Sequence, residues 1–195
     1  MQNNAKTVIR QYKNMRYFIG NLIRGEAAEY YKATCAELGS RFGIEDVSAI
    51  VPPHVTVKGP FERPNIDMVD DTLSLATEAP ALPIALSGWN HFTTRTIFLD
   101  VPAPSAELKS YIKEVLNKLV TIGLPLNVQE QNTHIHMSVA RFLKPNQFDE
   151  VWKYLQSAPA PQFDILFDNL TIFAKEKRED KAWKVLKTFP LTGKR

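Results

Sequence analysis

Two short segments of the chain each place a histidine two residues before a hydroxyl side chain. They read HVTV at residues 54–57 and HMSV at residues 136–139. Both segments lie in runs where apolar and polar residues alternate, a pattern that predicts a half-buried strand. Successive side chains of a strand point to opposite faces, so each histidine shares a face with its hydroxyl neighbour. The sequence therefore predicts two strands that each present one imidazole beside one hydroxyl.

Histidine can both donate and accept a proton near neutral pH. If His54 and His136 face one cleft, they form a general base and a general acid for in-line displacement at phosphorus. One imidazole would deprotonate the attacking oxygen, and the other would protonate the leaving oxygen. The hydroxyls of Thr56 and Ser138 would bind the non-bridging phosphate oxygens, whose charge rises in the transition state. This scheme requires no metal and no cofactor, and no carboxylate cluster stands near either segment.

Other side chains near the two segments are candidates for substrate contact. Lys58 follows the first segment and, by strict alternation, shares the face of His54 and Thr56, so we expect it to bind phosphate. Arg141 follows the second segment and by the same rule does not share the face of His136. Either cation could equally be a solvated charge.

Residues between and beside the motifs add weaker candidates. The connection 90–95 reads as a hairpin turn, where Phe92 and Arg95, with Trp89 just before them, would stack on a base or simply pack. His134 shares the face of His136 and would support it. His91 also precedes a hydroxyl by two residues, but no apolar residue follows that hydroxyl, so we expect His91 to lie outside the site.

Two other chemistries use the same residues. His54, His134 and His136 could bind zinc together, but no cysteine or acidic ligand stands at a spacing that supports a zinc site. Ser138 could act as an acyl-transfer nucleophile, but the glycine pattern of a nucleophile elbow is absent. A purely structural role for each histidine is the remaining alternative, and the matched pair of motifs argues against it.

Length and composition indicate an ordinary globular protein. The 195 residues suffice for one domain, and 44% are apolar and 23% are charged. The single cysteine, Cys35, has no intrachain partner, and no signal peptide or run of 18 apolar residues occurs. We therefore expect a cytoplasmic, monomeric protein without a membrane partner. Residues 1–15 read as a loosely ordered extension of a single domain that spans residues 1–195.

Periodicity predicts alternating strands and helices around the motif strands. Helices are expected at residues 26–42, 66–78, 105–122 and 145–155. Further strands are expected at residues 16–23, 82–89, 96–101, 133–143, 163–174 and 182–189. A helix and then a two-stranded hairpin follow each motif strand, so the element order repeats at the 82-residue spacing of the two histidines. The pattern predicts two similar halves of one domain.

Both motifs resemble the paired signature of the two-histidine phosphoesterases, the superfamily of 2'-5' RNA ligase-like proteins and RNA 2',3'-cyclic phosphodiesterases. The opening strand at residues 16–19, Phe61 and Phe142 after the motifs, and Trp183 in the closing hairpin extend the resemblance over most of the chain. The resemblance implies an α+β fold of two pseudo-symmetric lobes. Each lobe would be an antiparallel sheet backed by helices, and the two would flank a central groove. Residues 58–60 (KGP) depart from the apolar continuation of many members.

Together, the motifs and the resemblance predict a metal-independent phosphoesterase. Its substrate would be RNA or a nucleotide carrying a 2',3'-cyclic phosphate or a related ribose phosphodiester. An RNA- or nucleotide-binding module without turnover is the alternative from another class, and 2'-5' RNA ligase activity is a second alternative within the same fold. Matched acid and base groups favour catalysis, because binding alone does not require them.

Overall fold

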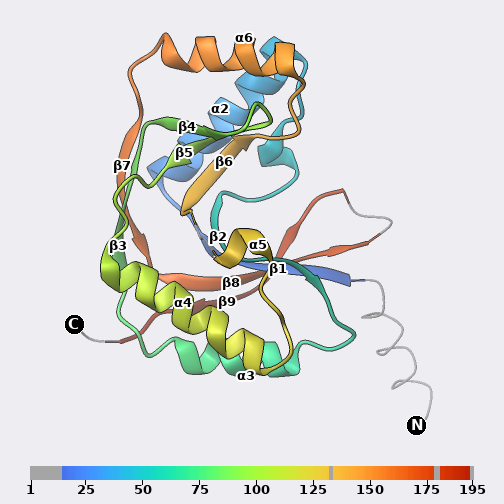
Figure 1. Cartoon of the computed structure of the whole chain (residues 1–195), viewed down its shortest axis with the longest axis vertical. Helices are drawn as coiled ribbons and strands as arrows, with labels where there is room; N and C mark the ends of the chain where they lie inside the picture. Colours follow the sequence, from blue (N-terminus) through green and yellow to red (C-terminus); the bar gives the residue numbers. More distant parts are fainter. Residues whose placement is uncertain (1–14, 132–133, 178–180, 194–195) are drawn as a thin grey trace.

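The structure is a computed structural model that describes residues 15–131, 134–177 and 181–193 (Figure 1). The extension expected at residues 1–15 lies outside the described residues, apart from Met15, which opens the first strand. Helices and antiparallel strands are mixed along the chain, and the sheets are backed by helices. The predicted α+β class is therefore confirmed, whereas the two pseudo-symmetric lobes and the central groove stay predictions.

A four-stranded antiparallel sheet carries the first motif. In spatial order its strands are β2 (His54–Glu62), β1 (Met15–Leu22), β8 (Asn169–Glu176) and β9 (Lys184–Pro190). Strand β1 lies in the interior of the sheet, and its residues Tyr17, Phe18 and Ile19 are buried. Figure 1 shows helices α3 (Asp67–Ala76) and α4 (Ala106–Thr121) below this sheet. The motif is thus fixed on a strand that packs against helices.

A three-stranded antiparallel sheet carries the second motif. Its strands are, in order, β4 (Trp89–Phe92), β5 (Thr96–Asp100) and β6 (His136–Ala140). Helices α2 (Glu26–Phe42) and α6 (Pro145–Gln156) lie above it in Figure 1. Helix α2 connects β1 to β2 along the chain, yet it packs against β6 of the other sheet. The segment that joins two strands of one sheet therefore covers the second sheet.

Two of the predicted strands are each divided in the structure, and the two parts belong to different sheets. The run 82–89 is divided at Gly88, whose φ of 76° turns the chain, so β3 (Leu82–Ser87) is separate from β4. The run 163–174 is divided at Asp168 into β7 (Gln162–Phe167) and β8. Strand β3 pairs with β7 in a two-stranded sheet, and β4 forms the hairpin with β5. The predicted partnership of 82–89 with 96–101, and a turn that begins at residue 90, were therefore wrong.

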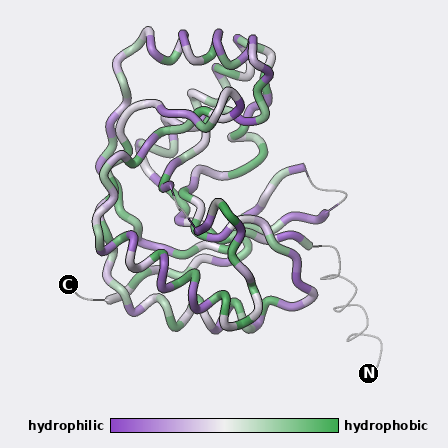
Figure 2. Tube along the Cα trace, in the orientation of Figure 1, coloured by the Kyte–Doolittle hydropathy of each residue, from purple (hydrophilic) through white to green (hydrophobic). Residues whose placement is uncertain are grey.

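The other predicted elements agree with the structure more closely. Helices α2, α3, α4 and α6 match their predicted ranges to within two residues at each end, because each has one apolar face. Figure 2 shows this alternation of hydrophilic and hydrophobic residues along the helices. Strand β6 is shorter than the predicted 133–143. The short helices η1 (Val47–Ala49) and α5 (Val128–Gln131) were not predicted, because neither is long enough to show a periodic apolar face.

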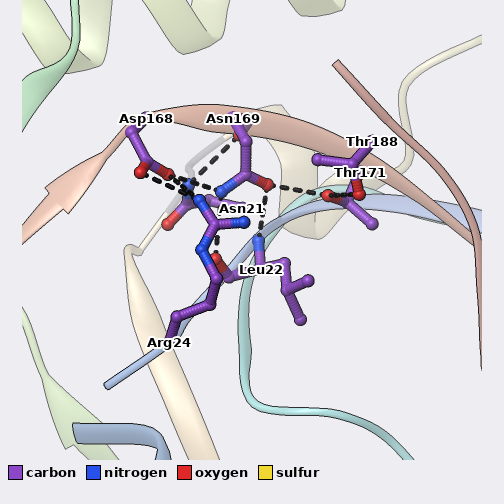
Figure 3. A network of polar contacts seen from close by, with 7 residues as sticks. All are labelled: Asn21, Leu22, Arg24, Asp168, Asn169, Thr171 and Thr188. Carbon is purple, nitrogen blue, oxygen red and sulfur yellow. Dashed lines mark hydrogen bonds and ion pairs between the residues drawn. The ribbon is translucent and has the colours of Figure 1, made fainter. Parts of the chain in front are cut away.

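A side-chain amide holds the point where the chain passes from β7 into β8 (Figure 3). Asn169 Oδ1 accepts a hydrogen bond from the Leu22 backbone N–H at 2.9 Å, and Asn169 Nδ2 donates to the Leu22 carbonyl at 3.0 Å. The amide thus occupies the place of a peptide group beside β1. Asp168 accepts two hydrogen bonds from Arg24, at 2.9 and 3.0 Å. These contacts fix the end of β1, where Leu22 pairs with His54.

A buried ion pair attaches α5 to β2. The Lys58 ammonium donates to both carboxylate oxygens of Glu130, at 2.8 and 2.9 Å, and both side chains are about 95% buried. The same carboxylate accepts the backbone N–H groups of Gly59 and Asn127. Every carboxylate oxygen is therefore paired, which offsets the cost of burying the charge.

No helix among the described residues is long and apolar enough to cross a membrane.

Replacing Glu130 with alanine should destabilise the protein by about 3–5 kcal/mol, because the buried Lys58 ammonium would lose its counter-ion. Urea unfolding at pH 7 measures the loss. Glu114→Ala, which breaks the exposed helical pair with Lys118, is the matched control and should cost less than about 1 kcal/mol. The double variant Lys58→Met, Glu130→Leu should recover only part of the stability, because the backbone N–H groups of Gly59 and Asn127 lose their acceptor. A Glu130→Ala variant as stable as the parent would contradict the role of the pair.

Candidate active site

The two motif strands lie against each other although they belong to different sheets. Strand β2 is the edge of the four-stranded sheet, β6 is the edge of the three-stranded sheet, and the two are in contact. The charge of a protonated His136 lowers the pKa of His54, so the two imidazoles interact electrostatically. The structure therefore brings together the two histidines that are 82 residues apart in the sequence.

His54 is half-buried at the start of β2 among aromatic rings. Its ring centroid lies 4.7 Å from that of Phe18 and 5.3 Å from that of Phe173. Its Nδ1 donates a hydrogen bond of 2.7 Å to the carbonyl of Pro52, two residues earlier. This bond leaves Nε2 as the ring nitrogen that is available to a substrate.

His136 repeats this arrangement at the start of β6. Its Nδ1 donates to the carbonyl of His134, again two residues earlier and again at 2.7 Å. Phe92 and Phe98 lie against the ring, with centroid distances of 4.9 and 4.7 Å. In both rings a backbone carbonyl two residues earlier therefore orients Nδ1.

Both imidazoles are held toward the neutral form. The pKa of His54 lies at about 4, below its ordinary 6.5; burial is the main cause, the bond to Pro52 opposes the shift, and the nearby positive charges of Arg141 and His136 add to it. Burial also lowers the pKa of His136, but the carbonyl of His134 and the carboxylate of Asp100 oppose that shift. The two sites differ in one respect, because only His136 has a carboxylate that favours its protonated form.

The strand register places the two hydroxyls on the faces of their histidines. Thr56 pairs with Gly20 of β1 two positions from the His54–Leu22 pair, and Ser138 pairs with Phe98 two positions from the His136–Asp100 pair. Both side chains are half-buried, and neither hydroxyl has a hydrogen-bond partner within the described part of the chain. Each hydroxyl is therefore available to an additional ligand.

Lys58 does not lie where strict alternation predicted it. Thr56 pairs with Gly20 but Lys58 pairs with Ile19, so the bulge between them sends Lys58 to the opposite face of the sheet. There it is buried and bound to Glu130. The same-face prediction was wrong, and its charge is already neutralised away from the imidazoles.

Arg141 instead supplies positive charge beside His54. It follows β6 directly, and because the strand ends at Ala140 the prediction that Arg141 does not share the face of His136 stays a prediction. Its positive charge contributes to the lowered pKa of His54. Its Nε is buried without a hydrogen-bond partner, and no described acidic residue forms an ion pair with it. An unpaired cation at this position is suited to an anionic ligand.

The hairpin candidates divide into those that touch the site and those that do not. Phe92 is 40% exposed and its ring meets His136 nearly at right angles. Arg95 is exposed in the turn between β4 and β5, and no side-chain contact joins it to either histidine. Trp89 packs on Tyr30 of α2, with centroids 6.3 Å apart. Of the three residues, only Phe92 is placed to contact a molecule bound beside the His136 ring.

The remaining histidines also have defined places. His134 Nε2 donates to Asp100 Oδ1 at 2.7 Å, while Asn90 Nδ2 donates to Asp100 Oδ2 at 2.9 Å. His134 thus supports His136, as predicted, through its carbonyl. His91 lies on the opposite face of the sheet, with its ring edge-on to Trp152 at 4.9 Å. His91 therefore lies outside the site, as expected.

Cys35 is buried under β6, where its thiol donates to the carbonyl of Val139 at 3.5 Å. Burial raises the pKa of this thiol to about 12. The thiolate is therefore strongly disfavoured, and Cys35 packs in the core.

Sequence reasoning missed two residues that position the histidines. A Cβ at Gly20 would lie 2.6 Å from the Val55 carbonyl oxygen and 3.3 Å from Cδ2 of His54, so this position requires glycine. A glycine inside a strand pattern is the signal that marks a close approach of this kind. Asp100 had no such signal, because its partner His134 lies 34 residues away along the chain.

Within the described ranges, no group of three or more histidine, cysteine or acidic side chains is arranged to hold a metal ion. The zinc alternative from His54, His134 and His136 therefore has no ligand geometry to support it.

Comparisons with known proteins agree with this fold. A family model described as the 2'-5' RNA ligase superfamily matches residues 39–179, so the chain belongs to that superfamily. A relative from Geobacillus kaustophilus, named "Putative phosphoesterase GK0864", is 26% identical over 151 residues, which cover 75% of this chain and 82% of the relative. A relative from Staphylococcus aureus strain Newman with the same description is 26% identical over 147 residues, or 72% and 82% of the two chains.

Solved structures show the same fold at low sequence identity. Escherichia coli LigT complexed with 3'-AMP is similar with a TM-score of 0.60 and 15% identity over 91% of this chain and 98% of LigT. A crystal structure described as a phosphoesterase gives a TM-score of 0.58 and 17% identity over 92% and 99% of the two chains. The superfamily and its relatives support a phosphoesterase or a 2'-5' RNA ligase-like protein.

The lowered histidine pKa values predict that stability falls in mild acid. In the unfolded chain His54 becomes protonated below about pH 6.5, whereas in the folded chain it becomes protonated only near pH 4. The free energy of unfolding should therefore decrease as the pH falls through this window, by about 2–3 kcal/mol from His54. Urea unfolding at pH 7 and pH 4.5 measures the loss, and His54→Gln should reduce it. His91→Gln, at an exposed position, is the control, and an equal loss in all three proteins would contradict the assignment.

Proposed function

We propose that the protein is a phosphoesterase that opens 2',3'-cyclic phosphates, or related ribose phosphodiesters of RNA or nucleotides, with two histidines as base and acid. The observation that carries this proposal is the repeated geometry of His54 and His136. Each donates Nδ1–H to a carbonyl two residues earlier, and each presents Nε2 beside an unpaired hydroxyl. A binding module would not require two proton-transfer groups in matched settings.

The difference between the two imidazoles assigns their roles. The pKa of His54 is lowered to about 4, so its imidazole is neutral at pH 7 and would accept the proton of the attacking water. His136 has its protonated form favoured by Asp100 and would donate a proton to the leaving ribose oxygen. As the water oxygen bonds to phosphorus, one of the two ester bonds of the cyclic phosphate breaks, and the proton count of the pair is conserved. The same geometry would accept a 5'-hydroxyl in place of water, which is the ligase alternative.

Three groups would stabilise the charge on phosphate. The hydroxyls of Thr56 and Ser138 would donate to the non-bridging oxygens, and Arg141 would supply the cation that Lys58 does not. This assignment agrees with the chemistry of the structural neighbours. LigT has been solved with 3'-AMP and, at a TM-score of 0.54, with phosphate. Phe92 would contact the base or ribose next to His136.

Substitution of the acid and the base tests the function. His54→Ala and His136→Ala should each lower kcat by roughly a hundredfold to ten-thousandfold. Thr56→Val and Ser138→Ala should cost roughly a hundredfold if each hydroxyl acts as an oxyanion donor. Hydrolysis of a panel of nucleoside 2',3'-cyclic phosphates in the presence of chelator measures the rates, with His91→Ala as the control. Full activity of either histidine variant would remove the assignment, and binding without turnover by the parent would favour the binding module.

The roles of the two histidines predict the effect of Asp100 on the pH profile. The profile of kcat/KM should be bell-shaped, with its acidic limb near the pKa of His54, about 4, and its alkaline limb at a lowered pKa of His136. Asp100→Asn removes a charge that raises the pKa of His136, so the alkaline limb should move to lower pH. Asp149→Asn, on the exposed side of α6, should leave both limbs in place. If Asp100→Asn moved the acidic limb instead, His136 would be the base and His54 the acid.

A further inference from the structure

A row of aromatic rings leads away from His54 across the same face of the four-stranded sheet. Phe18 lies 4.7 Å from His54 and 4.8 Å from Trp183, between ring centroids, and it meets Trp183 edge-on at 83°. Phe173 stacks on the other side of this row, parallel to Phe18 at 4.4 Å. Two ring-to-ring steps therefore separate the indole of Trp183 from the imidazole of His54, a distance on the scale of one nucleotide.

Trp183 is held firmly for a half-buried residue near a hairpin tip. Its backbone N–H donates to the Ile50 carbonyl at 2.7 Å. Ile50 lies two residues before Pro52, whose carbonyl orients His54. The indole and the catalytic imidazole are thus attached to the same short segment. Trp183 also lies beyond residues 39–179, the part of the chain that the family model matches.

A cation accompanies the indole. The Lys175 ammonium lies 5.1 Å from the centroid of the Trp183 ring. Lys175 pairs with Arg16 across β1 and β8, and so shares the face of Phe18 and His54. It is half-buried, and no acidic side chain among the described residues forms an ion pair with it. A half-buried cation with no acidic partner in the described part of the chain favours an incoming anion.

An open cavity of about 400 Å³ adjoins Lys175, and its lining includes Glu176, Lys184, Val185 and Leu186 but not Trp183. Val185 and Leu186 are 43% and 48% exposed, so apolar surface continues along β9. A flat indole, a flexible cation and adjoining apolar surface are the elements with which proteins hold single-stranded nucleic acid.

We propose that Trp183 and Lys175 bind the nucleotide next to the reacting phosphate, so that the preferred substrate is the end of an RNA strand and not a mononucleotide. The base stacks on the indole, and the ammonium moves on its flexible stem from the ring to the adjoining phosphate. In the free protein, the ammonium covers the ring surface that the base then occupies. This inference rests on the proposed function, because it assumes that the reacting phosphate of the RNA lies at His54.

The test compares a nucleoside 2',3'-cyclic phosphate with a trinucleotide that ends in the same group. The parent should have the higher kcat/KM for the trinucleotide. Trp183→Leu should lower the ratio of trinucleotide to mononucleotide kcat/KM by roughly 5- to 150-fold, the range expected for one stacked base, and Trp183→Phe should restore most of it. Lys175→Gln should lower the ratio and also reduce the salt dependence of trinucleotide binding by about one phosphate contact.

Trp152→Leu is the matched control, because Trp152 is a half-buried tryptophan on α6, behind the other sheet. Its ratio should equal that of the parent. If Trp183→Leu does not fold, Lys175→Gln decides, since Lys175 contributes no core packing. The inference would be overturned if the parent, Lys175→Gln and Trp183→Phe all gave the same ratio, with no preference for the trinucleotide. The phosphoesterase assignment would then remain intact. If no substrate is turned over, the affinities of 3'-phosphorylated mono- and trinucleotides give the same ratio, so the two proposals fail separately.

Discussion

Two strands that share no hydrogen-bonded ladder, β2 and β6, have to lie edge to edge for the two imidazoles to interact. Backbone pairing does not supply this contact, so other parts of the chain must hold it. Helix α2 begins beside β1 and packs on β6, and the short sheet of β3 and β7 leads from one large sheet to the other. The site therefore depends on connections between the sheets as much as on either sheet alone.

The candidate site was predictable where a local rule applies without interruption. Alternation along a strand placed His54 with Thr56 and His136 with Ser138, because no irregularity falls inside either pair. The same rule failed two residues later at Lys58, where the bulge reverses the face. Gly59 and Pro60, which follow at once, mark an irregular strand but do not tell which residue bulges. Arg141 lies just beyond the end of β6, and its effect on the pKa of His54 depends on the contact between β2 and β6, which the sequence alone does not show.

The fold was predictable to a similar limit. Helices follow from the spacing of apolar residues within one segment, whereas the partner of a strand is decided by segments far away in the chain. Apolar residues stand on both sides of Asp168 and Asn169 in the run 163–174, and these two polar residues do not indicate that the first half pairs with β3 and the second half with β1. The same limit hid Asp100, whose effect on His136 arises from pairing across β5 and β6.

The amide of Asn169 has a consequence for how the protein receives a substrate. By bonding both the N–H and the carbonyl of Leu22, it holds the end of β1 at the residue paired with His54, at the point where the chain leaves one sheet for another. A crossing of this kind is where a hinge would otherwise form, and here it is locked by the amide and by the Arg24–Asp168 pair. The strand end that carries the partner of His54 is accordingly fixed when the chain folds, so the place of His54 in its sheet does not wait for a ligand.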